Sequence, residues 1–231
     1  MNEIVAETAY FGVVISLLLY WFFSLLSKKV KYTLCNPLLL TIVAMIFLLS
    51  ICGIRYESYN NSAKYLTYFL TPATVCLAVP MYRQFEILKK NMAAVFLGIT
   101  AGCISHGIGI GVLTIAFRLS PQLKAALIPK SLTTAIAIGV SEELQGITSV
   151  TILSVVVTGI FGAVIAEGLF KFLKIQEPVA QGLACGTASH AIGTSKAVQL
   201  GEVQGAMSSL AIVVTGIITV VMAPIIMQMI V

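Results

Sequence analysis

Long apolar runs are the feature of this sequence that most constrains its fold. They extend from about Ala9 to Leu26, Leu34 to Gly53, Met92 to Phe117, Ile147 to Phe170 and Met207 to the C-terminus. A helix needs about 20 mostly apolar residues to cross the hydrocarbon core of a bilayer. Hydrophobic residues make up 58% of the chain and charged residues only 10%, against about 25% charged in soluble domains. The runs exclude a soluble globular fold and predict a single integral membrane domain over residues 1–231.

The charged residues lie between the apolar runs. Basic segments occur at Lys28 to Lys31, Arg83 to Lys90 and Lys171 to Lys174. Spacing of this kind is typical of loops that orient a membrane protein, and it argues against a nucleic-acid surface. The five cysteines stand singly, without CxxC spacing, so neither a disulfide framework nor a metal site is predicted. We expect no cofactor.

Three less apolar segments predict broken or re-entrant helices. The stretch Lys64 to Tyr82 contains two prolines, and Lys124 to Gly146 contains Pro129 among polar residues. Gln181 to Ala197 consists almost wholly of small residues. Together with the long runs, these segments predict an all-α polytopic membrane protein with seven or eight spans.

The two halves of the chain, about 1–118 and 119–231, resemble each other weakly. A broken segment from Thr71 to Pro80 precedes the long helix from Met92, and Thr187 to Lys196 precedes the helix from Met207. If residues 124–146 re-enter, all three basic loops lie on one side, the positive-inside rule is better obeyed, and the half-repeats are inverted. If the segment crosses fully, the third basic loop lies on the opposite side. Corresponding broken segments in two halves indicate a transporter binding site at the repeat interface.

The first candidate site is the segment Gly186 to Lys196. A membrane helix of small and hydroxyl residues gains little from lipid contact, so it either lines a polar cavity or packs tightly among other helices. The candidate binding residues in and near this segment are Thr187, Ser189, His190 and Thr194.

The second candidate site follows Pro129. A lysine at membrane depth needs an anionic partner or a path to the interface, so Lys130 either binds a carboxylate or is an interfacial loop residue. Ser131, Thr133 and Thr134 accompany it. Glu142, one or two turns further on, and His190 are the candidates for handling a coupled proton.

The first half carries weaker candidates of the same kind. Pro72 frees a backbone carbonyl, which the hydroxyls of Thr71 and Thr74 satisfy only in part, so this position is a polar spot at membrane depth. The alternative is that the proline marks only a kink in a packed helix. Asn36 is either an interfacial cap or a cavity residue. His106 stands alone among glycines, and a lone histidine there favours a hydrogen bond between helices over a ligand or proton relay.

Nothing in the sequence indicates an enzyme. The chain has no aspartate and neither a GxSxG nor an HExxH motif. Ser189 and His190 are neighbours, and neighbours on a helix point about 100° apart. Adjacency therefore does not make them a nucleophile and its base.

Five stretches of the chain together resemble the LrgB/CidB family. They are Asn36-Pro37-Leu38-Leu39, Thr71-Pro72-Ala73 to Pro80-Met81-Tyr82, Pro129 to Thr134 with Ser141-Glu142, Gly182-Leu183-Ala184 through Gly186 to Thr194, and Glu202 with Gln204 to Leu210. The chain departs from the family pattern at Ala135, where proline is frequent, and over Glu143 to Gly146, where glycines are frequent.

The resemblance implies a bacterial inner-membrane protein that works beside a small LrgA/CidA-like partner. Family members are described as modulators of murein hydrolase activity and cell lysis, and some are similar to carriers of glycolate, glycerate or pyruvate. The sequence thus favours a secondary carrier of a small carboxylate, assembled as a homodimer. The alternative is a holin- or antiholin-like lysis regulator that acts by a pore or by partner contact, without a substrate of its own.

Overall fold

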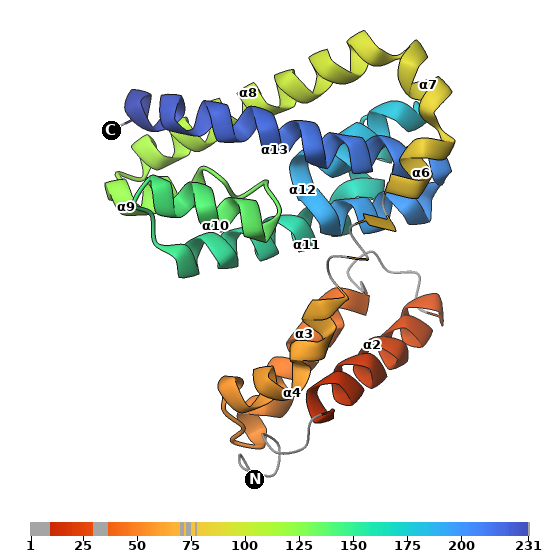
Figure 1. Ribbon diagram of the computed structural model, residues 1–231, viewed down its shortest axis with the longest axis vertical. Helices are drawn as coiled ribbons and strands as arrows, with labels where there is room; N and C mark the ends of the chain where they lie inside the picture. Colours follow the sequence, from red (N-terminus) through yellow and green to blue (C-terminus); the bar gives the residue numbers. More distant parts are fainter. Residues whose placement is uncertain (1–9, 30–36, 70–71, 73–74, 77, 231) are drawn as a thin grey trace. The chain divides into compact units, whose positions relative to one another are not determined.

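The computed structural model describes residues 10–29, 37–69, 72, 75–76 and 78–230. Each regular element in these residues is an α-helix, which confirms the predicted all-α fold class (Figure 1). The chain divides into two compact units, Met1–Cys76 and Leu77–Val231, called here the first and second unit. The expected half-repeats have a different boundary, near residue 118, and stay a prediction.

Three helices of the first unit pack together, namely α2 (Phe11–Lys29), α3 (Pro37–Ile51) and α4 (Tyr56–Tyr68). Gly12 lets α2 approach α4 closely, because a Cβ atom there would lie 2.7 Å from the backbone nitrogen of Ala63. The Gly12 N–H donates to Ser62 Oγ at 3.0 Å, and Ser16 Oγ lies 2.8 Å from the Tyr59 hydroxyl. One backbone-to-side-chain hydrogen bond and one between side chains therefore join the apolar helix α2 to the polar helix α4.

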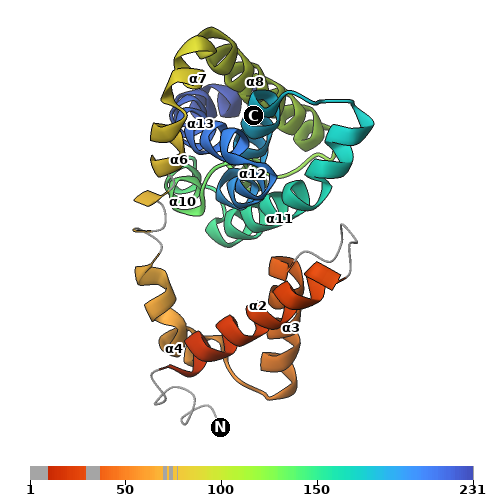
Figure 2. The ribbon, with the colours of Figure 1, turned by 90° about the vertical axis from the view of Figure 1, so that its right-hand side faces the viewer.

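Eight helices make up the described part of the second unit. They are α6 (Ala78–Arg83), α7 (Phe85–Lys90), α8 (Met92–Ala116), α9 (Pro121–Leu127), α10 (Thr134–Glu143), α11 (Thr148–Phe172), α12 (Pro178–Leu200) and α13 (Glu202–Ile230). Figures 1 and 2 show α8 beside α13, and α12 contacts α8, α11 and α13. Helix α12 is thus the central element of this unit.

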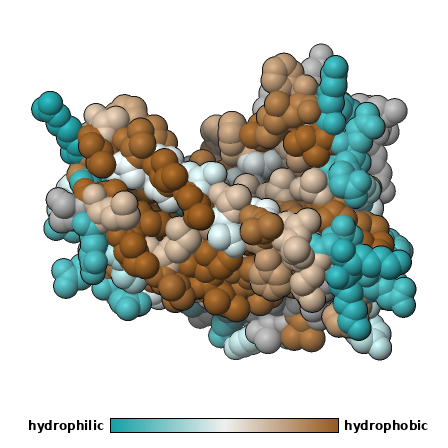
Figure 3. Space-filling view, turned by 90° about the horizontal axis from the view of Figure 1, so that it is seen from above, coloured by the Kyte–Doolittle hydropathy of each residue, from teal (hydrophilic) through white to brown (hydrophobic). Residues whose placement is uncertain are grey.

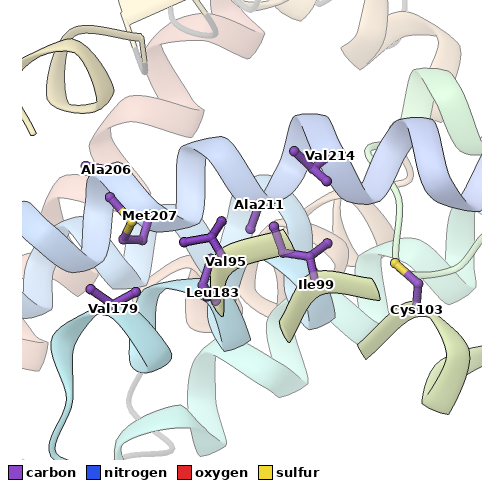
Figure 4. Packing of buried hydrophobic residues seen from close by; sticks show 9 residues of the cluster. All are labelled: Val95, Ile99, Cys103, Val179, Leu183, Ala206, Met207, Ala211 and Val214. Atoms are coloured by element: carbon purple, nitrogen blue, oxygen red, sulfur yellow. The ribbon is translucent and has the colours of Figure 1, made fainter. Parts of the chain in front are cut away.

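Small residues of α12 bring it close to α13. A Cβ atom on Gly182 would lie 2.5 Å from the Gln204 carbonyl oxygen, and one on Gly186 would meet the Ser208 carbonyl oxygen. Close backbone approach of this kind is how membrane helices gain packing contacts. Figure 4 shows the apolar cluster beside this contact, to which α8, α12 and α13 all contribute: Val95, Ile99, Cys103, Val179, Leu183, Ala206, Met207, Ala211 and Val214.

Three of the described helices, α8, α11 and α13, are long and apolar enough to cross a membrane. Their outward residues are large and apolar, such as Leu97, Phe161 and Val213, each more than half exposed. Figure 3 views the face on which α8 and α13 lie, with hydrophobic residues across its middle and hydrophilic residues at its two sides. Exposed apolar surface of this extent is suited to lipid rather than water.

The segment predicted to break at Pro129 is broken there. Helix α9 ends at Leu127, a turn follows in which Leu132 N–H donates to the Pro129 carbonyl at 3.0 Å, and α10 begins at Thr134. With 7 and 10 residues, neither helix alone can span a bilayer. Thr151 Oγ1 of α11 donates to Ser141 Oγ of α10 at 2.7 Å, which joins this segment to the following long helix.

Candidate functional site

Helix α12 is interrupted at Ser189 and His190, inside a segment for which the sequence predicted a break. Ser189 has φ −132° and ψ 16°, and His190 has φ 42° and ψ −136°. A non-glycine residue at positive φ is uncommon and strained. The His190 imidazole is buried, and its Nε2 lies 3.0 Å from the Val155 carbonyl oxygen of α11. This hydrogen bond fixes the residue at the break.

Two glycines of α11 make room for the break. A Cβ atom on Gly159 would lie 2.7 Å from the His190 ring, and one on Gly162 would collide with the Ser189 hydroxyl. The glycines are three residues apart, so they lie on one face of α11. The local sequence of α11 is therefore matched to the interruption of α12.

The second half of α12 is held by polar contacts to two other helices. Thr194 Oγ1 donates to the His190 carbonyl at 3.1 Å and lies 2.7 Å from Ser208 Oγ of α13. Lys196 Nζ forms an ion pair with Glu167 Oε1 of α11 at 2.6 Å. The half-helix after the break is thus joined both to α11 and to α13.

A cavity of about 920 Å³ opens beside the first half of α12. It is bounded by α8, α11, the first half of α12 and the turn between α9 and α10. The volume lies in the range of small-molecule pockets, roughly 300–1,000 Å³. Most of the lining is apolar, and its polar members are Asn91, His106, Lys130, Ser131, Thr158, Glu177, Thr187 and Ser189.

Two buried polar atoms in the lining have no hydrogen-bond partner among the described residues, His106 Nε2 and Thr187 Oγ1. Buried polar groups are nearly always paired, and an unpaired one costs about 1–3 kcal/mol. The two atoms come from different helices, α8 and α12. Their cost is removed when a ligand with polar atoms, or water, occupies the cavity.

Lys130 supplies the cavity with a cationic group. It lies in the turn between α9 and α10, is half-buried, and forms no ion pair with another described residue. A mostly apolar wall stabilises an ammonium charge less well than water does. An anion in the cavity would stabilise the charged form.

The sequence as a whole matches a known family. A model of the LrgB-like family matches residues 16–229, which include the cavity and the interrupted helix. The chain belongs to the LrgB-like family. Antiholin-like protein LrgB of Bacillus cereus (strain B4264) and that of Bacillus anthracis (strain CDC 684 / NRRL 3495) are each 35% identical to it over 224 residues, 96% of this chain and 97% of the relative. No solved structure matches the chain.

The family expected from the five motifs is therefore confirmed, and this LrgB-like chain is a membrane protein. Of the residues proposed from sequence, the cavity brings together four from two separate motifs: Lys130, Ser131, Thr187 and Ser189. The names of the relatives describe no enzymatic activity.

The other candidates of the LrgB-like chain lie elsewhere. Thr133 is the N-cap residue of α10, Thr134 is its first residue, and Glu142 is exposed near its end. The side chains of His190 and Thr194 are buried but do not line the cavity. Pro72 is exposed in the first unit. Asn36, Thr71 and Thr74 lie outside the described residues. The functional roles given to all of these residues stay predictions.

Sequence reasoning missed Asn91, Thr158 and Glu177, which also line the cavity, and it considered His106, another lining residue, only as a hydrogen bonder between helices. The hydrogen bond between helices that a lone histidine suggested is absent at His106 Nε2 in the described part of the chain. The spacing of α8 carried a signal, because Gly98, Gly102 and His106 recur every four residues and share one helix face. That face meets α12, since a Cβ atom on Gly102 would lie 2.9 Å from Thr187 Cγ2.

Proposed function

We propose that this LrgB-like protein is a secondary carrier of small monocarboxylates, and that the cavity of the second unit is its substrate site. One observation carries the proposal. A single cavity beside an interrupted helix contains a lysine and two buried polar atoms that all lack a partner among the described residues. Interrupted helices beside a central binding cavity are a common architecture of secondary transporters.

The lining suits an acid with a second oxygen near its carboxylate. The Lys130 ammonium attracts the carboxylate, and charge-assisted hydrogen bonds of this kind are roughly twice as strong as neutral ones. Hydroxyls of Ser131, Thr187 and Ser189 border the same cavity and pair with a keto or hydroxyl oxygen. Pyruvate, glycolate and glycerate have this chemistry.

The membrane organisation belongs to the same proposal. We place the protein in the bacterial inner membrane as a homodimer with seven or eight spans per chain. Residues 124–146 re-enter, the half-repeats are inverted, and a small LrgA/CidA-like protein is the membrane partner. The division of α12 into two half-helices supports this arrangement, because inverted-repeat carriers place such helices at the repeat interface.

The second candidate function is regulation of cell lysis. The printed name of the relatives, antiholin-like protein, favours it. In this function the protein acts by a pore or by partner contact, and the cavity has no transported substrate. A pore conducts many solutes without saturation, whereas a carrier gives saturable flux of particular solutes.

Uptake into proteoliposomes tests the carrier. We expect saturable uptake of labelled pyruvate, glycolate or glycerate, inhibited by excess unlabelled acid and without leakage of an entrapped dye. Lys130→Ala should reduce the uptake severalfold by weakening carboxylate binding. The matched control is Lys174→Ala, because Lys174 is exposed and outside the lining. Dye leakage that accompanies flux, or equal uptake by Lys130→Ala and the control, would contradict the proposal.

A further inference from the structure

His106 is the ionisable group of α8 that faces the cavity. Its Nε2 is buried without a hydrogen-bond partner among the described residues. The other histidine of the chain, His190, is directed to the Val155 carbonyl instead. A neutral imidazole can take up a proton at its free nitrogen, and histidine is the side chain most often used for such proton exchange.

The register of two helices places His106 level with the interruption of α12. A Cβ atom on Gly98 would be 3.7 Å from Leu183, and one on Gly102 would be 2.9 Å from Thr187. The contacts advance by four residues on both helices, so α8 and the first half of α12 run parallel. One turn further along α8 stands His106, at the height of the Ser189–His190 break. His106 and Ser189, the first residue of the break, line the same cavity.

Lys130 is the charged group of the lining that interacts with His106 electrostatically. Asn91 and Glu177 stand at the opposite end of the cavity, since they precede the parallel helices α8 and α12. Fifteen residues of helix separate Asn91 from His106, which corresponds to roughly 22 Å. His106 and Lys130 therefore occupy one end of the cavity, and Glu177 occupies the other.

The remaining titratable groups on the elements around His106 are engaged or exposed. Helix α11 contributes none to the lining. Cys103 contacts Thr219, Lys124 donates to the Ile230 carbonyl, Glu202 accepts from Gln84, and Glu167 pairs with Lys196. Cys185 is buried in a separate apolar cluster, and the exposed groups are Lys171, Glu142 and Glu143. His106 is thus the group of the lining suited to exchanging a proton beside Lys130.

We propose that His106 takes up and releases the proton that travels with the substrate. This inference rests on the proposed carrier function. A carboxylate held between Lys130 and His106 favours the imidazolium, and without the anion the lysine charge disfavours it. Proton and carboxylate therefore favour each other's binding by the same free energy. The proton enters at Nε2 from one side of the membrane and leaves from Nε2 to the other.

The test measures proton movement and acid movement separately. Proteoliposomes contain an entrapped pH-sensitive dye, and labelled pyruvate, glycolate or glycerate is added outside. The wild type should acidify its lumen as the acid enters and should accumulate the acid when the outside is more acidic. His106→Gln should lose both effects and bind the acid more weakly, but at a saturating concentration it should still exchange outside acid for acid loaded inside. The matched control is Ser105→Ala, because Ser105 neighbours His106 but is exposed and outside the lining.

Each outcome decides a different claim. No saturable flux or exchange with wild-type protein overturns the carrier and the inference together. If His106→Gln transports the acid and acidifies the lumen as the wild type does, only the role of His106 is overturned. The same holds if His190→Asn loses the acidification while His106→Gln retains it. Acidification lost together with exchange also counts against the inference when the variant is folded.

A second measurement remains decisive if His106→Gln fails to fold. The chain contains two histidines, so wild-type protein labelled with ¹⁵N-histidine gives two imidazole spin systems, which His190→Asn assigns. Adding the transported acid near neutral pH should move the His106 nitrogens toward the imidazolium signature and leave those of His190 in place. A His106 signal that does not respond to a saturating concentration of the acid overturns the inference.

Discussion

Single glycines determine whether the interrupted helix fits against its neighbour. Gly162 faces the Ser189 hydroxyl, whereas Gly168, six residues on, faces no atom of a described residue within 4 Å. Both are on α11 and differ chiefly in what surrounds them. Alanine substitutions at the two positions therefore distinguish the close packing required at the break from the general effect of replacing a glycine in a helix.

We expect Gly162→Ala to destabilise the protein by about 1–3 kcal/mol, as other overpacked sites do, because the new methyl group collides with Ser189. Gly168→Ala should be neutral or slightly stabilising, since alanine favours helix over glycine by up to about 1 kcal/mol. Thermal unfolding of the detergent-purified variants measures both. Equal melting temperatures for the two would contradict the close contact between α11 and the break.

Individual residues also show which features of the site could not be predicted from the sequence. The sequence singled out the polar residues after Pro129 and those after Gly186, and four of them share the cavity, while their roles stay predictions. His106 received little weight from the sequence, because the missing hydrogen-bond partner of its Nε2 among the described residues is visible only when the neighbouring helices are placed. The positive φ of His190 likewise follows from packing, since no glycine or proline marks the position.

Among the elements, the second half of α12 has an ionic contact as well as hydroxyl contacts. Lys196 pairs with Glu167 at 2.6 Å, and their side chains are 22% and 42% exposed. Exposed ion pairs contribute about 0.2–1 kcal/mol, because solvent screens them and two long side chains lose freedom. The pair therefore orients the half-helix more than it stabilises the fold.

A double-mutant cycle measures this contribution. Lys196→Ala, Glu167→Gln and the double variant should give a coupling free energy of about 0.2–1 kcal/mol in thermal unfolding, decreasing as salt is added. Each single variant should stay folded. A coupling near zero at low salt would show that the ion pair does not hold α12 to α11, and the Thr194–Ser208 contact with α13 would then be the principal polar contact of the half-helix.

The helices themselves were easier to predict than the contacts between them. The apolar runs from Met92, Ile147 and Met207 became α8, α11 and α13, because length and hydrophobicity are local properties. The glycine spacing of α8 is typical of a packing face but does not specify its partner, since any small-residue helix satisfies the same rule. The pairing of α8 with α12 is a long-range contact that one sequence does not specify.

At the scale of the molecule, the short helices α9 and α10 determine which loops share a side. They have 7 and 10 residues, so even the longer one rises only about 15 Å, half of the hydrocarbon thickness. If α8 and α11 each cross once and the segment between them enters and returns, Arg83 and Lys171 lie on the same side. A full crossing of residues 124–146 places them on opposite sides.

We therefore expect Arg83→Cys and Lys171→Cys, made separately in a cysteine-free background, to lie on the same, cytoplasmic face of the membrane. Both side chains are exposed, and both belong to basic segments, which the positive-inside rule assigns to the cytoplasm. A membrane-impermeant maleimide should label neither residue until the membrane is opened. Labelling of Lys171→Cys alone in intact cells would instead require an extra crossing between α8 and α11, and would exclude the inverted arrangement of the halves that the carrier proposal includes.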